Sequence, residues 1–229
     1  MSNEGSPDAV VDLTVMASNL AHFLLIQERS RLGVKKADIV EKILKGNSGL
    51  LRDVMLEANR ILEHNLGYKI QEVPGKRVYI VTNTMDFSCL EAYLTPDKHW
   101  EHVRGLICII LSLILMSSGE SIEESQLWGF LQQINVNRDD KRHPVFGDVE
   151  KMIKSTLVKQ HYLDYVKEKN GSGKFSWGFR AQHEFKPMEL LRFVADVYGD
   201  GKSASDFTTT YKRIFELEKE VVQSAEQES

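Results

Sequence analysis

The sequence predicts a mainly α-helical protein with small β-hairpins, built as two winged-helix modules in tandem. Two observations support this prediction. Three helix-periodic segments precede a β-hairpin signal in the first half of the chain, and the same order of three helices and a hairpin returns in the second half. The chain has 229 residues, which is enough for two modules of about a hundred residues each.

The first module is predicted to span residues 13–96, after a small, polar and acidic segment, 1–12, that predicts disorder. Its first helix carries one apolar stripe at helical spacing, made by Leu13, Met16, Ala17, Leu20, Phe23 and Leu24. Gly33 is expected to end this helix. Two more helices follow in "KKADIVEKILKG" and "GLLRDVMLEANRILEHNLG", and the second should be capped by Ser48 and closed by Gly67.

A β-hairpin completes the first module. The segments "YKIQEV" and "RVYIV" alternate apolar and polar residues on either side of Pro74-Gly75-Lys76, which has the composition of a turn. The following stretch, 82–98, has mixed polarity, contains a proline and lacks a clear period. It is therefore predicted to connect the two modules.

The second module is predicted to span residues 97–200. It begins with a long apolar helix over 99–116, followed by "SIEESQLWGFLQQI", in which Ser121 and Glu124 have the spacing of a capping box. Asp148 is the expected N-cap of a third helix, "VEKMIKSTLVKQH". The segments "YLDYVKE" and "KFSWGF" lie on either side of a glycine-rich turn and predict the second hairpin.

Composition narrows the setting of the protein. The net charge is −4, so contact with nucleic acid would have to come from a local patch. Cys89 and Cys108 are the two cysteines, and neither their number nor their spacing suggests a disulfide framework, which favours a cytosolic or nuclear compartment. The most apolar run, "GLICIILSLILM", is shorter than the ~20 residues of a membrane span. It predicts a buried helix.

Neither an enzyme nor a metal site is predicted. The glycines form no P-loop and no dinucleotide fingerprint. His99, His102 and Cys108 share a helix, but a zinc site needs a further ligand pair at useful spacing. His143 and Asp148 could be drawn as a catalytic pair, yet a loop with an N-cap explains both residues. We therefore expect no catalytic residue, no metal and no cofactor.

Positive charge gathers in the second module. Nine basic and six acidic residues lie between Arg138 and Lys174, whereas the third helix of the first module sets Arg52 and Arg60 beside acidic neighbours. The basic residues of the second module predict phosphate contact without base-specific readout, and a plain solvated face is the alternative. The candidates for DNA binding are Lys141, Arg142, Lys151, Lys154, Lys159, Lys167, Lys169 and Lys174.

Two apolar surfaces could bind partners. On the first helix, Leu25 and Ile26 fall outside the stripe, so they are either covered within the chain or form a docking surface for another protein. Residues 201–229 are predicted to form an amphipathic helix with an acidic tail. Its apolar stripe, which either folds back on the module or meets a partner, consists of Phe207, Tyr211, Ile214, Phe215, Val221 and Val222.

Several segments of the chain resemble the MAGE homology domain, the tandem winged-helix domain of the melanoma-antigen family. They are "HFLLIQE", "KKADIVEKIL", "GYKIQEV", "GLICIILSLILM", "HPVFGD", "LVKQHYLDY" and "FSWGFRA", in the order and spacing of that family. The resemblance extends from about Leu13 to Gly199. Within the family, the chain is most similar to the ancestral single-copy type that serves the SMC five/six complex.

The resemblance implies a non-enzymatic adaptor that works in DNA repair and chromosome maintenance in the nucleus. Its implied partners are a RING-type ubiquitin ligase subunit (non-SMC element one), a kleisin (non-SMC element four), SMC subunits and double-stranded DNA. The adjacent leucines that the family uses for the ligase map onto Leu24 and Leu25, and Ile26 follows them. The helical stripe, in contrast, places Leu24 in the core.

The resemblance also implies that the kleisin contacts the second module. Phe146, Tyr162 and Trp177 are the aromatic candidates there, although core packing is the ordinary role of each. We therefore expect an adaptor that holds a ligase and a kleisin and touches DNA without sequence preference. The alternative is a free-standing winged-helix DNA-binding regulator, which would bind selected sequences tightly at physiological salt.

Overall fold

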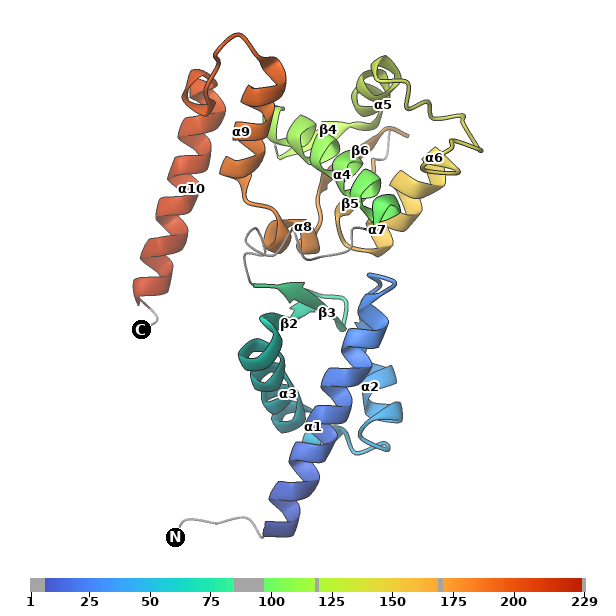
Figure 1. Cartoon of the computed structure of the whole chain (residues 1–229), viewed down its shortest axis with the longest axis vertical. Helices are drawn as coiled ribbons and strands as arrows, with labels where there is room; N and C mark the ends of the chain where they lie inside the picture. The colour runs from blue at the N-terminus through green and yellow to red at the C-terminus, as the bar shows by residue number, and fades with distance from the viewer. Residues whose placement is uncertain (1–6, 85–96, 118–119, 169–170, 228–229) are drawn as a thin grey trace. The chain divides into compact units, whose positions relative to one another are not determined.

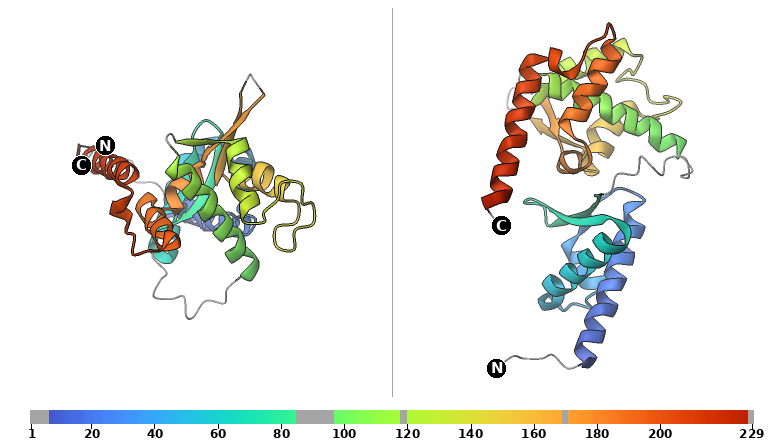
Figure 2. Two further views of the ribbon diagram at one scale, coloured as in Figure 1. Left: turned by 90° about the horizontal axis from the view of Figure 1, so that it is seen from above. Right: turned by 60° about the vertical axis from the view of Figure 1, so that its left-hand side comes forward.

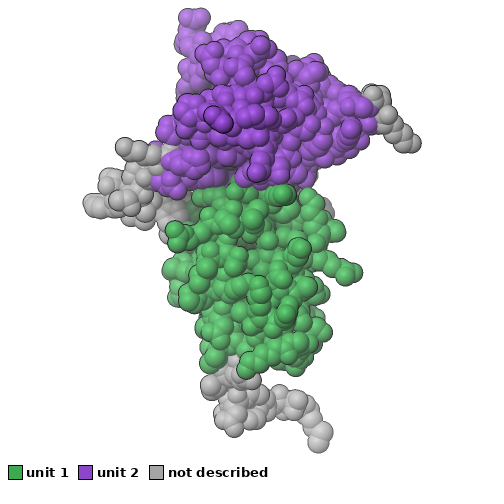
Figure 3. All heavy atoms as spheres, turned by 90° about the vertical axis from the view of Figure 1, so that its right-hand side faces the viewer, with its two compact units in different colours: residues 1–95, 159–161 green, residues 96–158, 162–229 purple. Residues whose placement is uncertain are grey.

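A computed structural model describes residues 7–84, 97–117, 120–168 and 171–227. The chain divides into two compact units, residues 1–95 with 159–161 and residues 96–158 with 162–229 (Figure 3). Each is mainly helical with one small antiparallel sheet, and the predicted fold class is confirmed.

Unit 1 has three main helices and a three-stranded sheet (Figure 1). The helices are α1 (Pro7–Glu28), α2 (Lys36–Lys42) and α3 (Leu51–Leu66), and a 3-10 turn, η1 (Ser48–Leu50), leads into α3. The strands are β1 (Val34–Lys35), β2 (Tyr68–Val73) and β3 (Val78–Asn83), in the order β1-β3-β2.

The core of unit 1 lies between α1, α3 and the sheet. Ala17, Leu20 and Leu24 of the predicted stripe are buried against Val54, Ala58 and Leu62 of α3. Gly67 ends α3 in the left-handed conformation, with φ 64°, as its sequence position predicts.

Two expectations about helix ends in unit 1 are wrong. Asn47 caps the turn before α3, because its side chain accepts the Gly49 N–H, and Ser48 lies within the turn. Helix α1 ends at Glu28, before Gly33. A Cβ at position 33 would lie 2.2 Å from the Val78 side chain, so this glycine lets the backbone approach β3 closely.

Unit 2 repeats the order of unit 1 and extends it. Its helices are α4 (Lys98–Met116), α5 (Glu124–Gln133), α6 (Val149–Lys151), α7 (Leu157–Lys159), α8 (Phe179–Glu184), α9 (Pro187–Tyr198) and α10 (Thr208–Gln227). A π-helical segment, η3 (Met152–Thr156), joins α6 to α7, and a 3-10 turn, η4 (Ala204–Asp206), precedes α10. The strands β4 (Ser121–Glu123), β5 (Leu163–Lys167) and β6 (Gly173–Trp177) have the order β4-β6-β5.

Helix α4 is the centre of unit 2 and contacts β4, β6 and α9 (Figure 1). By length and composition alone, residues 99–116 could cross a membrane, but the core helix of a folded domain passes the same test. We interpret α4 as such a core helix, because it buries Val103, Leu106, Ile107, Ile110, Leu111 and Ile114 among the other helices and the sheet.

The second hairpin and the cap of the third helix agree with the sequence. Leu163 pairs with Trp177 and Lys167 with Gly173 across β5 and β6, and the Asp148 carboxylate accepts the Lys151 N–H at 2.9 Å. The predicted capping box is wrong. Ser121 lies in β4 opposite Ser176, and α5 begins at Glu124, whose carboxylate bonds other side chains.

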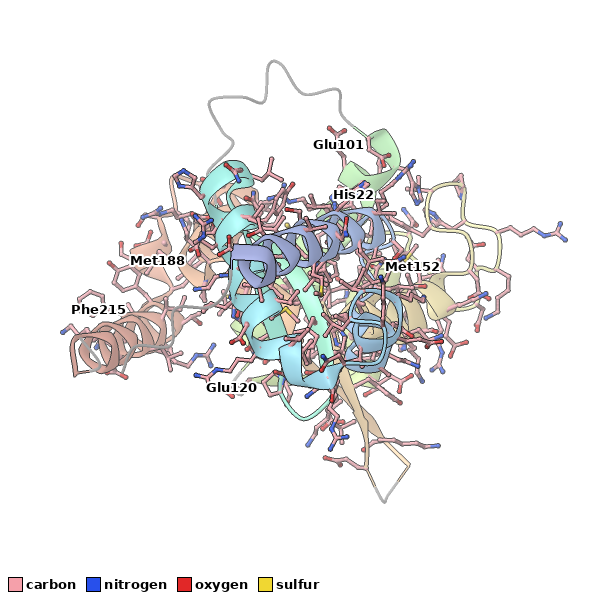
Figure 4. All side chains as sticks on the ribbon, turned by 90° about the horizontal axis from the view of Figure 1, so that it is seen from below. His22, Glu101, Glu120, Met152, Met188 and Phe215 are labelled. Atoms are coloured by element: carbon pink, nitrogen blue, oxygen red, sulfur yellow. The ribbon has the colours of Figure 1, made fainter. Side chains whose placement is uncertain are left out.

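Helices α9 and α10 lie side by side at the end of unit 2 (Figures 1 and 2). Ile214 is buried, and the Arg213 guanidinium donates hydrogen bonds to the carbonyls of Leu115 and Ser117 at the end of α4. Phe215, labelled on α10 in Figure 4, is 47% exposed. The predicted stripe is therefore only partly covered within the chain, and the side chains of Val221 and Val222 are not described.

Two segments differ from their predicted boundaries. Helix α1 begins at Pro7, so residues 7–12 are helical and not disordered as the sequence suggested, while 1–6 lie outside the described residues. Of the predicted connector, 82–98, the first two residues belong to β3 and the last to α4. Residues 85–96, which include Cys89, lie outside the described residues.

Candidate partner and nucleic-acid interfaces

The three candidates for ligase binding differ in accessibility. Leu24 is 1% exposed, as the helical stripe predicts. Leu25 is half-buried and packs against the core of unit 1, so it is partly covered within the chain, which is one of the two predicted alternatives. Ile26 is 54% exposed and presents the accessible aliphatic side chain at this end of α1. His22, labelled on the same helix in Figure 4, is also exposed.

The aromatic candidates of unit 2 are mostly used inside it. Tyr162 is fully buried, and its hydroxyl donates a hydrogen bond to Glu184 at 2.7 Å. Trp177 is half-buried, and its Nε1–H donates to the Leu111 carbonyl at 3.1 Å. These contacts give both residues the core role that the sequence left open. The third candidate, Phe146, lies on a surface loop and is half-buried.

The "HPVFGD" loop is closed on itself. The His143 Nδ1 accepts the backbone N–H groups of Val145 and Phe146, each at 3.2 Å. The His143 ring stacks on Phe146 with centroids 4.7 Å apart. Because Nδ1 is occupied in the turn and Asp148 caps a helix, the two residues do not form a nucleophile-activating pair.

A buried charge lies on α8, and it was not among the residues predicted from the sequence. The Arg180 side chain is fully buried, its Nη1 donates to Glu184 at 3.0 Å, and its guanidinium lies 5.7 Å from the centre of the Tyr162 ring. Arg180 and Glu184 are four residues apart on α8, so the i,i+4 spacing in "FRAQHE" was the available signal.

An apolar groove lies between the end of α4 and α5. It encloses about 500 Å³ and is lined by Leu113, Met116, Ser117, Ile122, Gln126, Gly129, Phe130 and Gln133. Phe130 is 48% exposed beside it, and Met116 is 36% exposed. This groove could not be predicted from the sequence, since Leu113 and Met116 belong to a helix that the apolar pattern assigns to the core.

Three of the predicted DNA-binding lysines are paired within unit 2. Lys154 Nζ lies 2.8 Å from the Glu124 carboxylate, and Lys174 Nζ lies 2.7 Å from Glu168. Lys141 lies 3.3 Å from Glu150. These carboxylates reduce the positive charge that the local count of residues suggested.

Four of the predicted DNA-binding residues stay accessible. Arg142, Lys151, Lys159 and Lys167 are exposed, and none of them forms an ion pair with another described residue. Lys169 lies outside the described residues. The accessible positive charge of the predicted patch therefore comes from about half of its members.

Glu124 is the centre of the paired network. Its carboxylate accepts hydrogen bonds from Lys154 at 2.8 Å, Tyr165 at 2.6 Å and Trp128 at 3.3 Å. Burial opposes its ionisation, but these donors outweigh burial and lower the pKa of Glu124 to about 2. The network ties the start of α5 to η3 and to the wing strand β5.

Within the described ranges, no three His, Cys, Asp or Glu side chains come together as a metal ion would require. Cys108 is a half-buried free thiol on α4. Burial raises the pKa of this thiol, and the nearby Arg104 only partly offsets the effect. Such a thiol is a poor nucleophile at neutral pH.

Comparisons with known proteins agree with this architecture. The MAGE homology domain matches residues 20–188. The human non-structural maintenance of chromosomes element 3 homolog is 32% identical over 196 residues, which cover 84% of this chain and 64% of the human protein. Its mouse counterpart is 29% identical over 209 residues, which cover 90% and 73%. The chain thus spans less than two thirds of the human relative.

A further relative and a solved structure are also similar to this chain. Melanoma-associated antigen D1 of the rat is 29% identical over 195 residues, which cover 83% of this chain and 24% of that protein. A chain of the solved "Nse1-Nse3-Nse4 complex" is 28% identical and superposes with a TM-score of 0.80, over 92% of this chain and 99% of that chain.

Proposed function

Because the chain belongs to the MAGE homology domain family, we propose that it is a non-enzymatic adaptor subunit of an SMC five/six-type complex. It binds a RING-type ubiquitin ligase subunit through unit 1 and a kleisin through unit 2. It also contacts double-stranded DNA without sequence preference, in DNA repair and recombination on nuclear chromatin. The adaptor supports ligase activity by positioning the ligase subunit. Holding two reactants close together accelerates their reaction, so no chemical group of the adaptor needs to take part.

One observation carries this proposal. The likeness to a chain of the Nse1-Nse3-Nse4 complex extends over nearly the whole of both chains, at 28% identity. Relatives that share a winged-helix fold alone would not be expected to match across both units, so the likeness favours a shared assembly over a free-standing regulator.

The ligase surface is assigned to the exposed side of α1 near Ile26. Single exposed aliphatic residues are common on protein surfaces, but an accessible isoleucine beside the half-buried Leu25 can be covered by a partner without unfolding unit 1. Leu24 supports this surface from the core, because it is buried against α3.

The test is a pull-down of the purified RING subunit by the tagged full chain, with Ile26→Asp as the variant. Leu56→Asp is the matched control, since Leu56 is an exposed aliphatic residue of the same unit on another helix, α3. The proposal predicts that binding is lost with Ile26→Asp and kept with Leu56→Asp. If the folded wild type does not retain the RING subunit, the ligase adaptor role is refuted.

The kleisin surface is assigned to the groove between α4 and α5. A short amphipathic segment of a partner can place an apolar side chain in such a groove, and Phe130 at its rim is available for contact. Phe130→Asp should abolish capture of the kleisin. Phe215→Asp on α10 is the control, because Phe215 is exposed to nearly the same extent, 47% against 48%.

The DNA contact is assigned to the accessible residues Arg142, Lys151, Lys159 and Lys167. Contact with phosphates alone predicts weak binding that falls steeply as salt is raised and does not depend on base sequence. Fluorescence anisotropy with two unrelated duplexes at several salt concentrations tests this point. Tight, sequence-selective binding at physiological salt would instead support a DNA-binding regulator.

A further inference from the structure

We propose that the wing of unit 1 is a second phosphate-binding site, at which Lys35, Lys36 and Arg77 hold the sugar-phosphate backbone of duplex DNA. The inference rests on the proposed DNA contact but assigns part of it to the other unit. The acidic residues of the third helix of unit 1 weaken its attraction for phosphate. The Arg60 guanidinium, for example, forms an ion pair with the Glu57 carboxylate at 2.6 Å. Lys35, Lys36 and Arg77 of the wing, in contrast, form no ion pair with a described residue.

The fold brings the three cations together from two distant segments. Lys35 of β1 pairs with Val78 of β3, directly after the hairpin turn, and the Lys36 N–H donates a hydrogen bond to the Arg77 carbonyl at 3.0 Å. Adjacent strands lie about 5 Å apart. All three side chains are exposed. They are therefore accessible to a ligand at the base of the turn between β2 and β3.

The positive charges of these three residues are not neutralised by nearby carboxylates. Within the described part of the chain, Lys35, Lys36 and Arg77 form no ion pair, in contrast to the paired lysines of unit 2. Glu72 of β2 is engaged by the Tyr79 hydroxyl, and burial together with this carboxylate raises the pKa of Tyr79. The two segments 31–42 and 69–77 contain seven basic and three acidic residues, so the local charge is positive.

All three residues occupy positions that the local fold disfavours for them. Lys35 is the N-cap of α2 and makes no side-chain cap, where Ser, Thr, Asp or Asn would be preferred. Lys36 begins α2, and the positive end of the helix dipole disfavours a cation there. Arg77 has φ 51°, a left-handed conformation that Gly or Asn adopts at lower cost. Three such departures at one place suggest that the charges serve binding.

The composition of the surface favours nucleic acid over a protein partner. The turn consists of Pro74, Gly75, Lys76 and Arg77, all exposed and without a large apolar side chain. Lysine is depleted at protein–protein interfaces, whereas protein–DNA interfaces are polar and strongly positive. A charged surface without an aromatic or aliphatic anchor fits a phosphodiester backbone better than a protein.

The test compares two triple variants of the full chain that carry the same change in net charge. The wing variant is Lys35→Ser, Lys36→Gln and Arg77→Asn, and each new residue suits the local backbone, so its melting temperature should not fall. The control is Lys45→Asn, Arg52→Gln and Lys212→Gln. Lys45 also has a positive φ, 48°, and all three control positions are exposed.

Binding of a fluorescent duplex is measured by anisotropy between 50 and 200 mM salt. If each phosphate contact contributes about 0.9 to the slope of log K against log salt, the wing variant should lose about 2.7 from the slope. Over this range the wild type should then lose about 40-fold more affinity than the wing variant. The control should follow the wild type.

Each other outcome overturns the inference in a distinguishable way. If neutralising Arg142, Lys151 and Lys167 lowers the slope while the wing variant keeps it, the wing inference fails and the DNA contact of unit 2 stands. If the wild type binds the RING subunit but no duplex, both DNA assignments fail and the adaptor role stands. If poly-glutamate competes as well as duplex at equal charge, the wing is a site for acidic polypeptides instead.

Discussion

The third helix of unit 2 and the wing of unit 1 use their positive charges in opposite ways. Around the third helix, Lys141, Lys154 and Lys174 each lie within 3.3 Å of a carboxylate. At the wing, Lys35 and Arg77 have no such neighbour among the described residues. A paired lysine contributes to the fold of its unit, and an unpaired one is available to a ligand. The lesson is that pairing, and not the count of basic residues, decides where an anion can bind.

The apolar residues predicted to bind partners also differ in accessibility between the two units. Unit 1 leaves Ile26 and Leu56 exposed on its helices, whereas unit 2 buries Tyr162 and holds Trp177 through a hydrogen bond to α4. Unit 2 has an accessible apolar groove beside Phe130, and α9 and α10 also expose apolar side chains, such as Val197 and Phe215. Substitutions of core residues should therefore affect stability, whereas substitutions of contact residues should affect binding.

Arg180→Ala should destabilise unit 2 by about 3–5 kcal/mol, because it removes a fully buried side chain, leaves a cavity beside Tyr162 and deprives the partly buried Glu184 of its partner. The three tryptophans, Trp100, Trp128 and Trp177, all belong to unit 2, so denaturant unfolding followed by tryptophan fluorescence reports on this unit. Unchanged unfolding would show that the pair does not stabilise the unit. The exposed Arg60 of unit 1 is the control, and Arg60→Ala should leave the fluorescence transition in place.

Leu24→Ala should lower the free energy of unfolding of unit 1 by about 2–4 kcal/mol, because the side chain is buried in the core and its loss leaves a cavity. Ile26→Ala should cost less than about 0.5 kcal/mol, because the side chain is half in solvent. Circular dichroism during thermal unfolding compares the two variants. Equal losses of stability in the two variants would contradict the proposal that Leu24 stabilises the core and that Ile26 contacts the partner.

Glu124→Gln should destabilise unit 2 by about 2 kcal/mol at pH 7, less than the full pKa shift implies because water reaches part of the site. The folded pKa of about 2 lies below the ordinary value of 4.5. The contribution of the ionised carboxylate is therefore present above pH 4.5 and is lost as the pH falls toward 2.

The measurement is the free energy of unfolding of wild type and Glu124→Gln between pH 7 and pH 2.5. The difference in free energy of unfolding between the two proteins should become smaller below about pH 4.5. A gap that stays constant would mean that the network stabilises the unit by packing and not by charge.

The smallest expected effect separates paired from accessible cations in unit 2. Lys151→Gln should reduce the slope of log K against log salt for duplex DNA by about 0.9, because Lys151 is exposed and forms no ion pair with a described residue. Lys141→Gln should change the slope less, because Lys141 is held by Asp148 and Glu150. Equal changes in an anisotropy titration would show that the ion pairs open when DNA binds.

The architecture could largely be predicted from the sequence. Helical spacing located α1, α3 and α4, and the alternation around Pro74-Gly75 and around 170–173 located both hairpins. Local chemistry was less decisive at helix starts. Ser121 and Glu124 have capping-box spacing, but pairing of β4 with β6 outweighs a local cap because it satisfies several backbone groups at once.

The candidate surfaces were harder to predict, because accessibility is decided by contacts between distant segments. Glu124 meets Lys154 and Tyr165 across 30 and 41 residues. Lys36 meets Arg77 through the short strand β1, which has only two residues and no sequence signal of its own. The role of Leu24 could be predicted, since a stripe along one helix is local information.

The adaptor role is tested most directly by reconstitution. The full chain, the RING subunit and the kleisin would be mixed after separate purification, and the mass of the eluted complex would be measured by size-exclusion chromatography with light scattering. We predict one complex that contains all three proteins, reduced to the pair with the kleisin by Ile26→Asp and to the pair with the RING subunit by Phe130→Asp. Elution of the folded wild-type chain alone would contradict the proposed function.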